Sequence, residues 1–150
     1  MVVPTTTRST NVGARVVLAL LGAAGLMVAA FLNWTDDIRG LDLSWQALYR
    51  TEFVTADNIY KTVGGLSILL GLLLVVSLSS WFGSFTRLIG GLGIVMFALF
   101  AIELYRDGQS HDVQLGAWMA LVASVLAVIG GFVGAGTRTV VAPSMDDHVT

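Results

Sequence analysis

Four long apolar runs occupy more than half of the chain, and almost no charged residue falls inside them. The runs cover residues 14–34, 63–82, 88–105 and 116–135. At a rise of about 1.5 Å per residue, each is about long enough to cross a hydrocarbon core of roughly 30 Å. Inside lipid every backbone N–H and C=O group must find a partner within the protein, so each run is expected to be a helix. The sequence therefore predicts an all-α fold, a four-transmembrane-helix bundle.

The composition supports a membrane location. Of the 150 residues 55% are hydrophobic and 12% are charged, whereas soluble domains carry about 25% charged residues. The short connections leave room for a single transmembrane domain over 1–150, with polar tails at 1–13 and 136–150. The net charge of −2 argues against a nucleic-acid partner, which needs a basic stripe. The chain contains no cysteine, which excludes thiolate metal sites and thiol catalysis.

The connection 35–62 is the only long one. Apolar residues in its centre recur at helical spacing, which predicts a short interfacial helix in this first outer loop, lying at the membrane surface or over the mouth of the bundle. The face of that helix would be formed by Leu41, Trp45, Leu48 and Tyr49. Thr55 is suited to cap the second spanning helix, which is then expected to begin near Ala56.

An even number of spans places both termini on the same side of the membrane. With the termini inside, each side carries four Lys or Arg residues, so the count of basic residues is tied. The long connection and most of the acidic residues then lie outside, which favours cytoplasmic termini. The expected location is the cell inner (plasma) membrane, with the chain crossing it several times. Aromatic residues at the predicted span ends are expected to form a belt in the headgroup layer, namely Trp34, Tyr60, Trp81, Tyr105 and Trp118.

Glu103 is the one ionisable residue within the hydrophobic part of a predicted span. Acids inside a membrane are costly and are often functional, for instance in proton or ion transfer. In the alternative interpretation Glu103 extends outward from the last turn of its helix and pairs with Arg106 at i+3, or with Lys61 across the bundle. The structural interpretation is favoured, because a proton relay needs several such groups and the other spans supply none.

Small residues recur at helix-packing intervals, most densely in the fourth span. Such rows let helix backbones approach closely, which holds bundles together in lipid, where no hydrophobic force acts between helices. Packing within one chain explains most of them, but the fourth span has small residues on two sides, so one side is a candidate contact for a neighbouring subunit. The candidate packing or partner-interface residues are Gly116, Ala120, Ser124, Ala123, Ala127, Gly131, Gly130 and Gly134, together with Trp45, Leu48 and Tyr49 of the loop.

His111, with Asp107 and Asp112, is the arrangement that comes closest to a metal site. No second histidine lies nearby, and an even number of spans places His148 on the opposite face of the membrane. The two histidines therefore cannot ligate one zinc or haem iron. We predict no metal, no cofactor and no catalytic residue, and the protein is not expected to be an enzyme.

The whole chain resembles the small four-helix integral membrane proteins common in actinobacteria. The resemblance lies in the Ala/Gly/Val/Leu-rich spans, in a first helix ending in Leu32-Asn33-Trp34, and in a last helix that begins Gly-Ala-Trp-Met-Ala at Gly116. It is compositional, and it implies a source group rather than an activity. Small chains of this kind also resemble supernumerary subunits of actinobacterial respiratory complexes, which lack redox centres and pack around catalytic subunits.

These observations predict a non-catalytic accessory or assembly subunit of a larger membrane complex, with a respiratory oxidase or supercomplex as the expected host. The expected partners are the lipid bilayer and other integral membrane subunits. One alternative is a small proton- or ion-linked transporter or channel that uses Glu103. Another is a membrane factor for envelope lipids or cell division.

Overall fold

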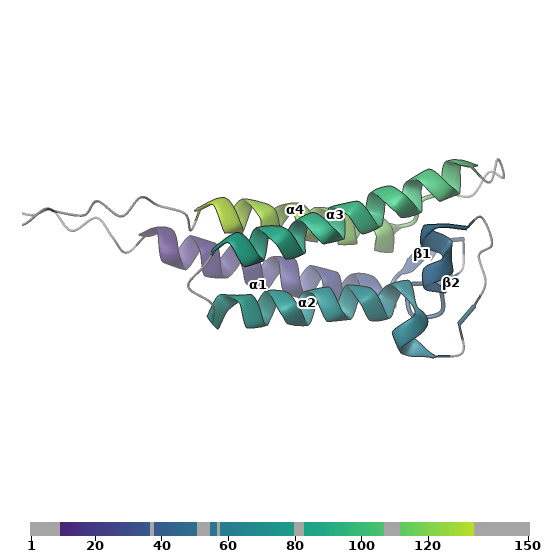
Figure 1. Cartoon of the computed structure of the whole chain (residues 1–150), viewed down its shortest axis with the longest axis horizontal. Helices are drawn as coiled ribbons and strands as arrows, with labels where there is room; N and C mark the ends of the chain where they lie inside the picture. The colour runs from purple at the N-terminus through teal and green to yellow at the C-terminus, as the bar shows by residue number, and fades with distance from the viewer. Residues whose placement is uncertain are drawn as a thin grey trace, which may run out of the picture.

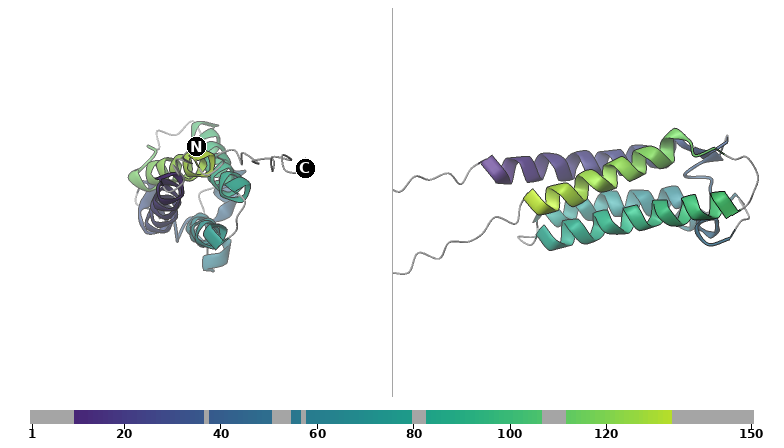
Figure 2. Two further views of the ribbon diagram at one scale, coloured as in Figure 1. Left: turned by 90° about the vertical axis from the view of Figure 1, so that its left-hand side faces the viewer. Right: turned by 90° about the horizontal axis from the view of Figure 1, so that it is seen from above.

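The computed structural model describes residues 10–36, 38–50, 55–56, 58–79, 83–106 and 112–133. Its described residues form four α-helices, which are α1 (Thr10–Phe31), α2 (Val63–Ser79), α3 (Gly83–Arg106) and α4 (Leu115–Val133). The helices run up and down in turn, and each packs against its neighbour in sequence, while α4 also packs against α1 (Figures 1 and 2). The predicted all-α bundle is confirmed.

Short elements gather at the end of the bundle where α1 stops and α2 starts (Figure 1). They are β1 (Asn33–Thr35), β2 (Ile38–Arg39) and two 3₁₀ helices, η1 (Trp45–Leu48) and η2 (Ile59–Lys61). The strands are antiparallel, and the turn between them holds Asp36 at a φ of 37°, in the left-handed region that aspartate tolerates better than most residues. We call the described residues between 33 and 62 the end cap.

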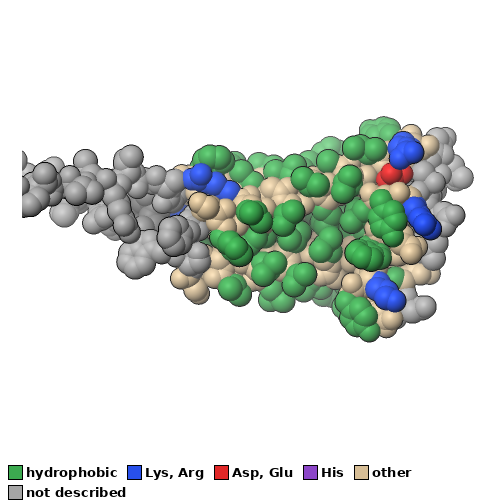
Figure 3. Space-filling model, viewed as in Figure 1, with side chains coloured by type: hydrophobic (Ala, Val, Ile, Leu, Met, Phe, Trp, Pro, Cys, Tyr) green, Lys and Arg blue, Asp and Glu red, His purple; other side chains and the backbone are tan. Residues whose placement is uncertain are grey.

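Three helices, α1, α3 and α4, are long and apolar enough to cross a membrane, whereas α2 is apolar but has only 17 residues. Large hydrophobic side chains are exposed on the outer faces of all four helices. In Figure 3 they cover the middle of the molecule, and Lys and Arg side chains gather toward its two ends. A soluble monomer rarely exposes so wide an apolar surface, whereas lipid chains would cover it. The surface fits embedding in a lipid bilayer.

Two helix boundaries differ from the predicted spans 14–34 and 88–105. The first helix ends at Phe31, because the next residues turn into β1 and the backbone amides of Gly40 and Leu41 bond to carbonyls at its end. The third begins at Gly83, before its apolar run. Thr86, a polar residue near its start, is fully buried. Its hydroxyl lies 3.1 Å from the hydroxyl of Ser77 on α2, so it has a hydrogen-bond partner inside the bundle. The fourth helix, predicted over 116–135, is described over Leu115–Val133.

The predicted start of the second helix near Ala56 is wrong. The helix begins at Val63, and the hydroxyl of Thr62 accepts a hydrogen bond of 2.9 Å from the amide of Gly65. Thr55, the expected capping residue, instead forms a bridge with Leu43. The chain before Val63 is therefore held by bridges within the end cap and by the 3₁₀ turn η2 rather than by α-helical bonds. The end of the predicted span at 80–82 lies outside the described residues.

The predicted interfacial helix is reduced to a single 3₁₀ turn, η1. Backbone bridges join Leu43 to Thr55 and Ser44 to Thr62, so the chain just before η1 is extended and paired rather than helical. The prediction of which residues share one face of this short helix is also wrong. Leu48 is buried, but Trp45 and Tyr49 are exposed. Ala47 takes the inward position instead.

Candidate interaction surface

The backbone of the end cap is tied to three helices. Val63 and Gly64 at the start of α2 donate to the carbonyls of Leu43 and Gly40, over 2.8 and 2.7 Å. Gln114, just before α4, donates to the carbonyl of Trp34 over 3.0 Å. These bonds satisfy groups that helix ends leave without partners, and they give the end cap a fixed position on the bundle.

Trp34 anchors the end cap from inside. Its side chain is fully buried, its indole N–H donates 2.8 Å to the carbonyl of Ala29, and its ring meets Phe100 edge to face at 5.3 Å. The expectation that Trp34 belongs to the headgroup belt is therefore wrong. Because α1 ends three residues earlier, the indole folds back under the helix end and finds a polar partner there.

Glycines make room for this buried tryptophan. A Cβ atom at Gly116 on α4 would lie 2.6 Å from the carbonyl oxygen of Asn33 and 2.8 Å from the ring of Trp34. One at Gly40 would lie 2.7 Å from the indole nitrogen. All three distances are shorter than real Cβ contacts. The end cap thus fits closely onto α4.

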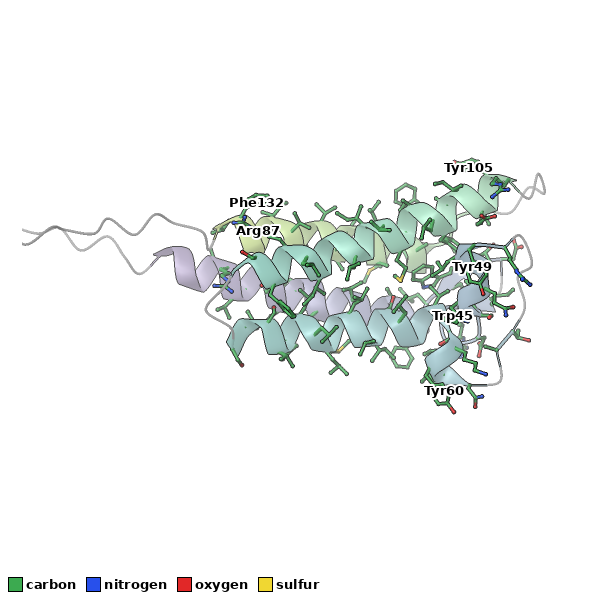
Figure 4. The ribbon with its side chains drawn as sticks, in the orientation of Figure 1. Trp45, Tyr49, Tyr60, Arg87, Tyr105 and Phe132 are labelled. Atoms are coloured by element: carbon green, nitrogen blue, oxygen red, sulfur yellow. The ribbon has the colours of Figure 1, made fainter. Side chains whose placement is uncertain are left out.

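The outer side of the end cap presents an aromatic pair. Trp45 and Tyr49 are 52% and 53% exposed, and their rings meet edge to face at 6.5 Å. The guanidinium carbon of Arg50 lies 5.9 Å from the centre of the Tyr49 ring. Figure 4 shows Trp45 and Tyr49 on the end cap, at the end of the bundle opposite Arg87. Arg50 was not among the residues predicted from the sequence, although arginine is the residue type that most often lies over an aromatic ring.

Other aromatic residues predicted for the belt are strongly exposed. Tyr60 is 78% exposed in η2, Tyr105 is 83% exposed in the last turn of α3, and Trp118 is 51% exposed in the first turn of α4. All three belong to the same end of the bundle as the end cap. Trp81 lies outside the described residues. This end therefore carries side chains suited to a headgroup layer.

The small residues of α4 are all turned inward, and they serve contacts within the chain. Ala123 and Ala127 lie against Gly22 of α1, where an added Cβ would be 2.9 Å from the carbonyl of Ala123. On the other side, Ser124 lies against α3 and Gly131 accepts a hydrogen bond from Arg87. The buried candidates are Gly116, Ala120, Ala123, Ser124, Ala127, Gly130 and Gly131, and Gly134 lies outside the described residues. In this fold the rows of small residues on α4 face α1 and α3 and are not open to a second subunit, whereas the exposed face of the helix carries large apolar side chains such as Val122 and Ile129.

Glu103 lies where its helix leaves the apolar region. Its side chain is 8% exposed and accepts a hydrogen bond of 3.0 Å from Arg106, whose own side chain is 68% exposed. This is the i+3 pair considered from the sequence, rather than the pair with Lys61. The exposed guanidinium group of the arginine places the charge pair toward the end of the bundle.

The described residues contain no group of three His, Asp or Glu side chains that could hold a metal ion. Asp112 is exposed, whereas Asp107, His111 and His148 lie outside the described part of the chain.

Comparisons of the chain with protein families, with curated proteins and with solved structures give no match.

Proposed function

We propose that this protein is a non-catalytic accessory or assembly subunit of a larger membrane complex, and that its partner binds the end cap. The observation that carries the proposal is the exposed Trp45–Tyr49 pair with Arg50 beside it. Tryptophan, tyrosine and arginine are the residue types that most often dominate the energy of protein–protein interfaces.

The rigidity of the end cap supports this role. Its backbone bonds to the helix ends fix the chain just before η1, and bonds within that turn, such as the one from the amide of Tyr49 to the carbonyl of Gln46, position the aromatic pair. A preorganised surface loses less conformational freedom on binding, so more of the contact energy appears as affinity. The aromatic pair thus supplies a contact that α4, whose small residues face inward, does not offer.

The resemblance to supernumerary subunits makes a respiratory oxidase or supercomplex the first host to test. We further propose that both termini face the cytoplasm, so that the end cap lies on the outer side of the plasma membrane. The long connection and most of the acidic residues support this orientation.

The experiment is affinity purification of the tagged full-length protein in mild detergent, with quantitative mass spectrometry of the bound membrane proteins. The wild type is expected to recover partner subunits in stoichiometric amounts. Tyr49→Ala combined with Arg50→Ala should reduce that recovery by about tenfold or more, because the loss of an interface hot spot costs about 2 kcal/mol.

Tyr105→Ala is the matched control, because it removes an aromatic ring that is even more exposed than that of Tyr49 but lies on α3 rather than on the end cap. It should leave recovery close to wild type. Recovery of the chain alone, or only with copies of itself, would contradict the proposal. Equal losses in both variants would assign the aromatic residues to membrane anchoring instead.

The alternative function, ion-linked transport through Glu103, is tested by Glu103→Gln in liposomes. Under our proposal the wild type shows no proton- or ion-linked flux above that of protein-free vesicles, and Glu103→Gln still recovers the partners. A flux that the substitution abolishes would favour the transporter.

A further inference from the structure

A groove of about 410 Å³ lies on the outer side of α2, next to the end cap. Its walls are Trp45 of η1 and Tyr60 of η2, which lie at the same end of the bundle in Figure 4. Its floor follows α2 through Gly65, Leu69 and Leu72. The volume falls in the range of small-molecule sites, which run from about 300 to 1,000 Å³.

The groove owes its depth to glycine. A Cβ atom at Gly65 would collide with the carbonyl oxygen of Ile59, so only glycine lets η2 lie directly on the first turn of α2. The hydroxyl of Thr62 holds this arrangement by donating to the Ile59 carbonyl over 2.6 Å. As a result the ring of Tyr60 projects beside α2 and closes one side of the groove.

We propose that this groove binds one acyl chain of a membrane phospholipid, whose phosphate meets the ammonium group of Lys61. The inference does not depend on the proposed accessory function. It depends on the groove being open to lipid, and the half-exposed side chains of Leu69 and Leu72 are continuous with the apolar belt of the bundle.

The direction of the groove suits an acyl chain. Gly65, Leu69 and Leu72 recur at i, i+4 and i+7, so the floor runs along the axis of α2 for roughly 10 Å. Lipid chains run in the same direction as a membrane-crossing helix. The upper end of the groove is formed by Trp45 and Tyr60, the kinds of residue found at the depth of lipid headgroups.

A basic residue that does not line the groove itself but lies between two residues that do, Tyr60 and Thr62, favours a phosphate. Lys61 is the last residue of η2, directly after Tyr60 of the groove wall, and it is exposed. A lysine stem can cover apolar surface while its ammonium group reaches the headgroup layer. A helix from another protein fits less well, because close helix contacts in lipid need small residues and this floor presents leucines.

The test measures lipid binding to the detergent-purified full-length protein by native mass spectrometry. The titrants are phosphatidylglycerol and a diacylglycerol with the same acyl chains. We expect one phosphatidylglycerol per chain, with an apparent Kd about fivefold or more below that of the diacylglycerol, since a lysine near anionic headgroups contributes about 1 kcal/mol. Lys61→Ala should remove this preference, whereas Arg39→Ala, which changes an exposed charge on β2, should keep it.

Leu69→Trp fills the groove and should weaken binding of both titrants by about tenfold or more. Leu92→Trp is the control, because it places the same bulk on an exposed position of α3. Equal binding by the wild type and Leu69→Trp would overturn the proposal, and so would equal binding of the two lipids. A wild-type dimer that Leu69→Trp separates would identify a second copy of the chain as the occupant. Tyr49 does not line the groove, so failure of the partner experiment and failure of this one are distinguishable.

Discussion

At the scale of single residues, Gly22 and Gly91 occupy similar apolar helices but meet different surroundings. A Cβ atom at Gly22 would lie 2.9 Å from the carbonyl oxygen of Ala123 and 3.2 Å from the Cβ of Ala127, both on α4. At Gly91 an added Cβ would meet nothing within 4 Å. One glycine sets the distance between two helices, and the other has no packing reason in the described structure.

We therefore predict opposite effects of the same substitution. Gly22→Ala should destabilise the bundle by about 1–3 kcal/mol, because the new methyl group overpacks the contact between α1 and α4. Gly91→Ala should be neutral or should stabilise by about 0.5–1 kcal/mol, because alanine is the better helix former. Titration of both variants with sodium dodecyl sulfate, followed by circular dichroism, measures the difference. Equal stability of the two variants would contradict the close contact.

Two tryptophans show what residue type and position cannot predict. Trp34 ends the predicted first span and Trp45 belongs to the predicted interfacial helix, and for both a position at the membrane surface is the usual expectation. The structure buries Trp34 because the Ala29 carbonyl and the Phe100 ring are within its reach, and it exposes Trp45. The difference comes from contacts with α3 and with the end of α1. The sequence around each residue contains no trace of those contacts.

At the scale of elements, the four helices were predictable because hydrocarbon imposes them on long apolar runs. The ends of the helices were less predictable. The hydroxyl groups of Ser77 and Thr86 form a hydrogen bond inside the bundle, which lets α3 start before its apolar run. The short helix expected in the centre of the end cap is present, but only as the 3₁₀ turn η1. Its spacing of apolar residues fits a helical face, but pairing with the chain before α2 requires extended backbone, and tertiary pairing overrode the local pattern.

The candidate site was predictable in part. Trp45 and Tyr49 were selected because their spacing placed them on one face of a short helix, and both are exposed. The small residues of α4 were selected for their spacing, but spacing cannot tell which helix a row contacts. The structure places the two rows of small residues on α4 against α1 and α3. Neither row is therefore available for the partner contact that was considered from the sequence.

At the scale of the whole molecule, the up-and-down order gives the bundle two distinct ends. The end cap and its aromatic side chains form one, and the start of α1, the end of α2, the start of α3 and the end of α4 belong to the other (Figure 1). Basic residues are shared equally between the two ends under the expected topology, so the orientation depends on the position of the end cap.

We predict that the end cap faces outward. The chain contains no cysteine, so each introduced cysteine is a single labelling site. In intact cells a membrane-impermeant maleimide should label Asn58→Cys in the end cap and should label Gly13→Cys at the start of α1 only after the cells are opened. Both positions are exposed in the bundle. The reverse pattern would place the termini outside.

The central claim, that a partner protein binds the end cap, is tested most directly by photo-crosslinking in native membranes. A benzoylphenylalanine side chain in place of Tyr49 should join the chain to one other membrane protein, the same one recovered in stoichiometric amounts with the wild type. The same group in place of Val76, exposed on α2 toward the other end of the bundle, should give no such product. No protein adduct at the Tyr49 position, or the same adduct from both positions, would contradict the claim.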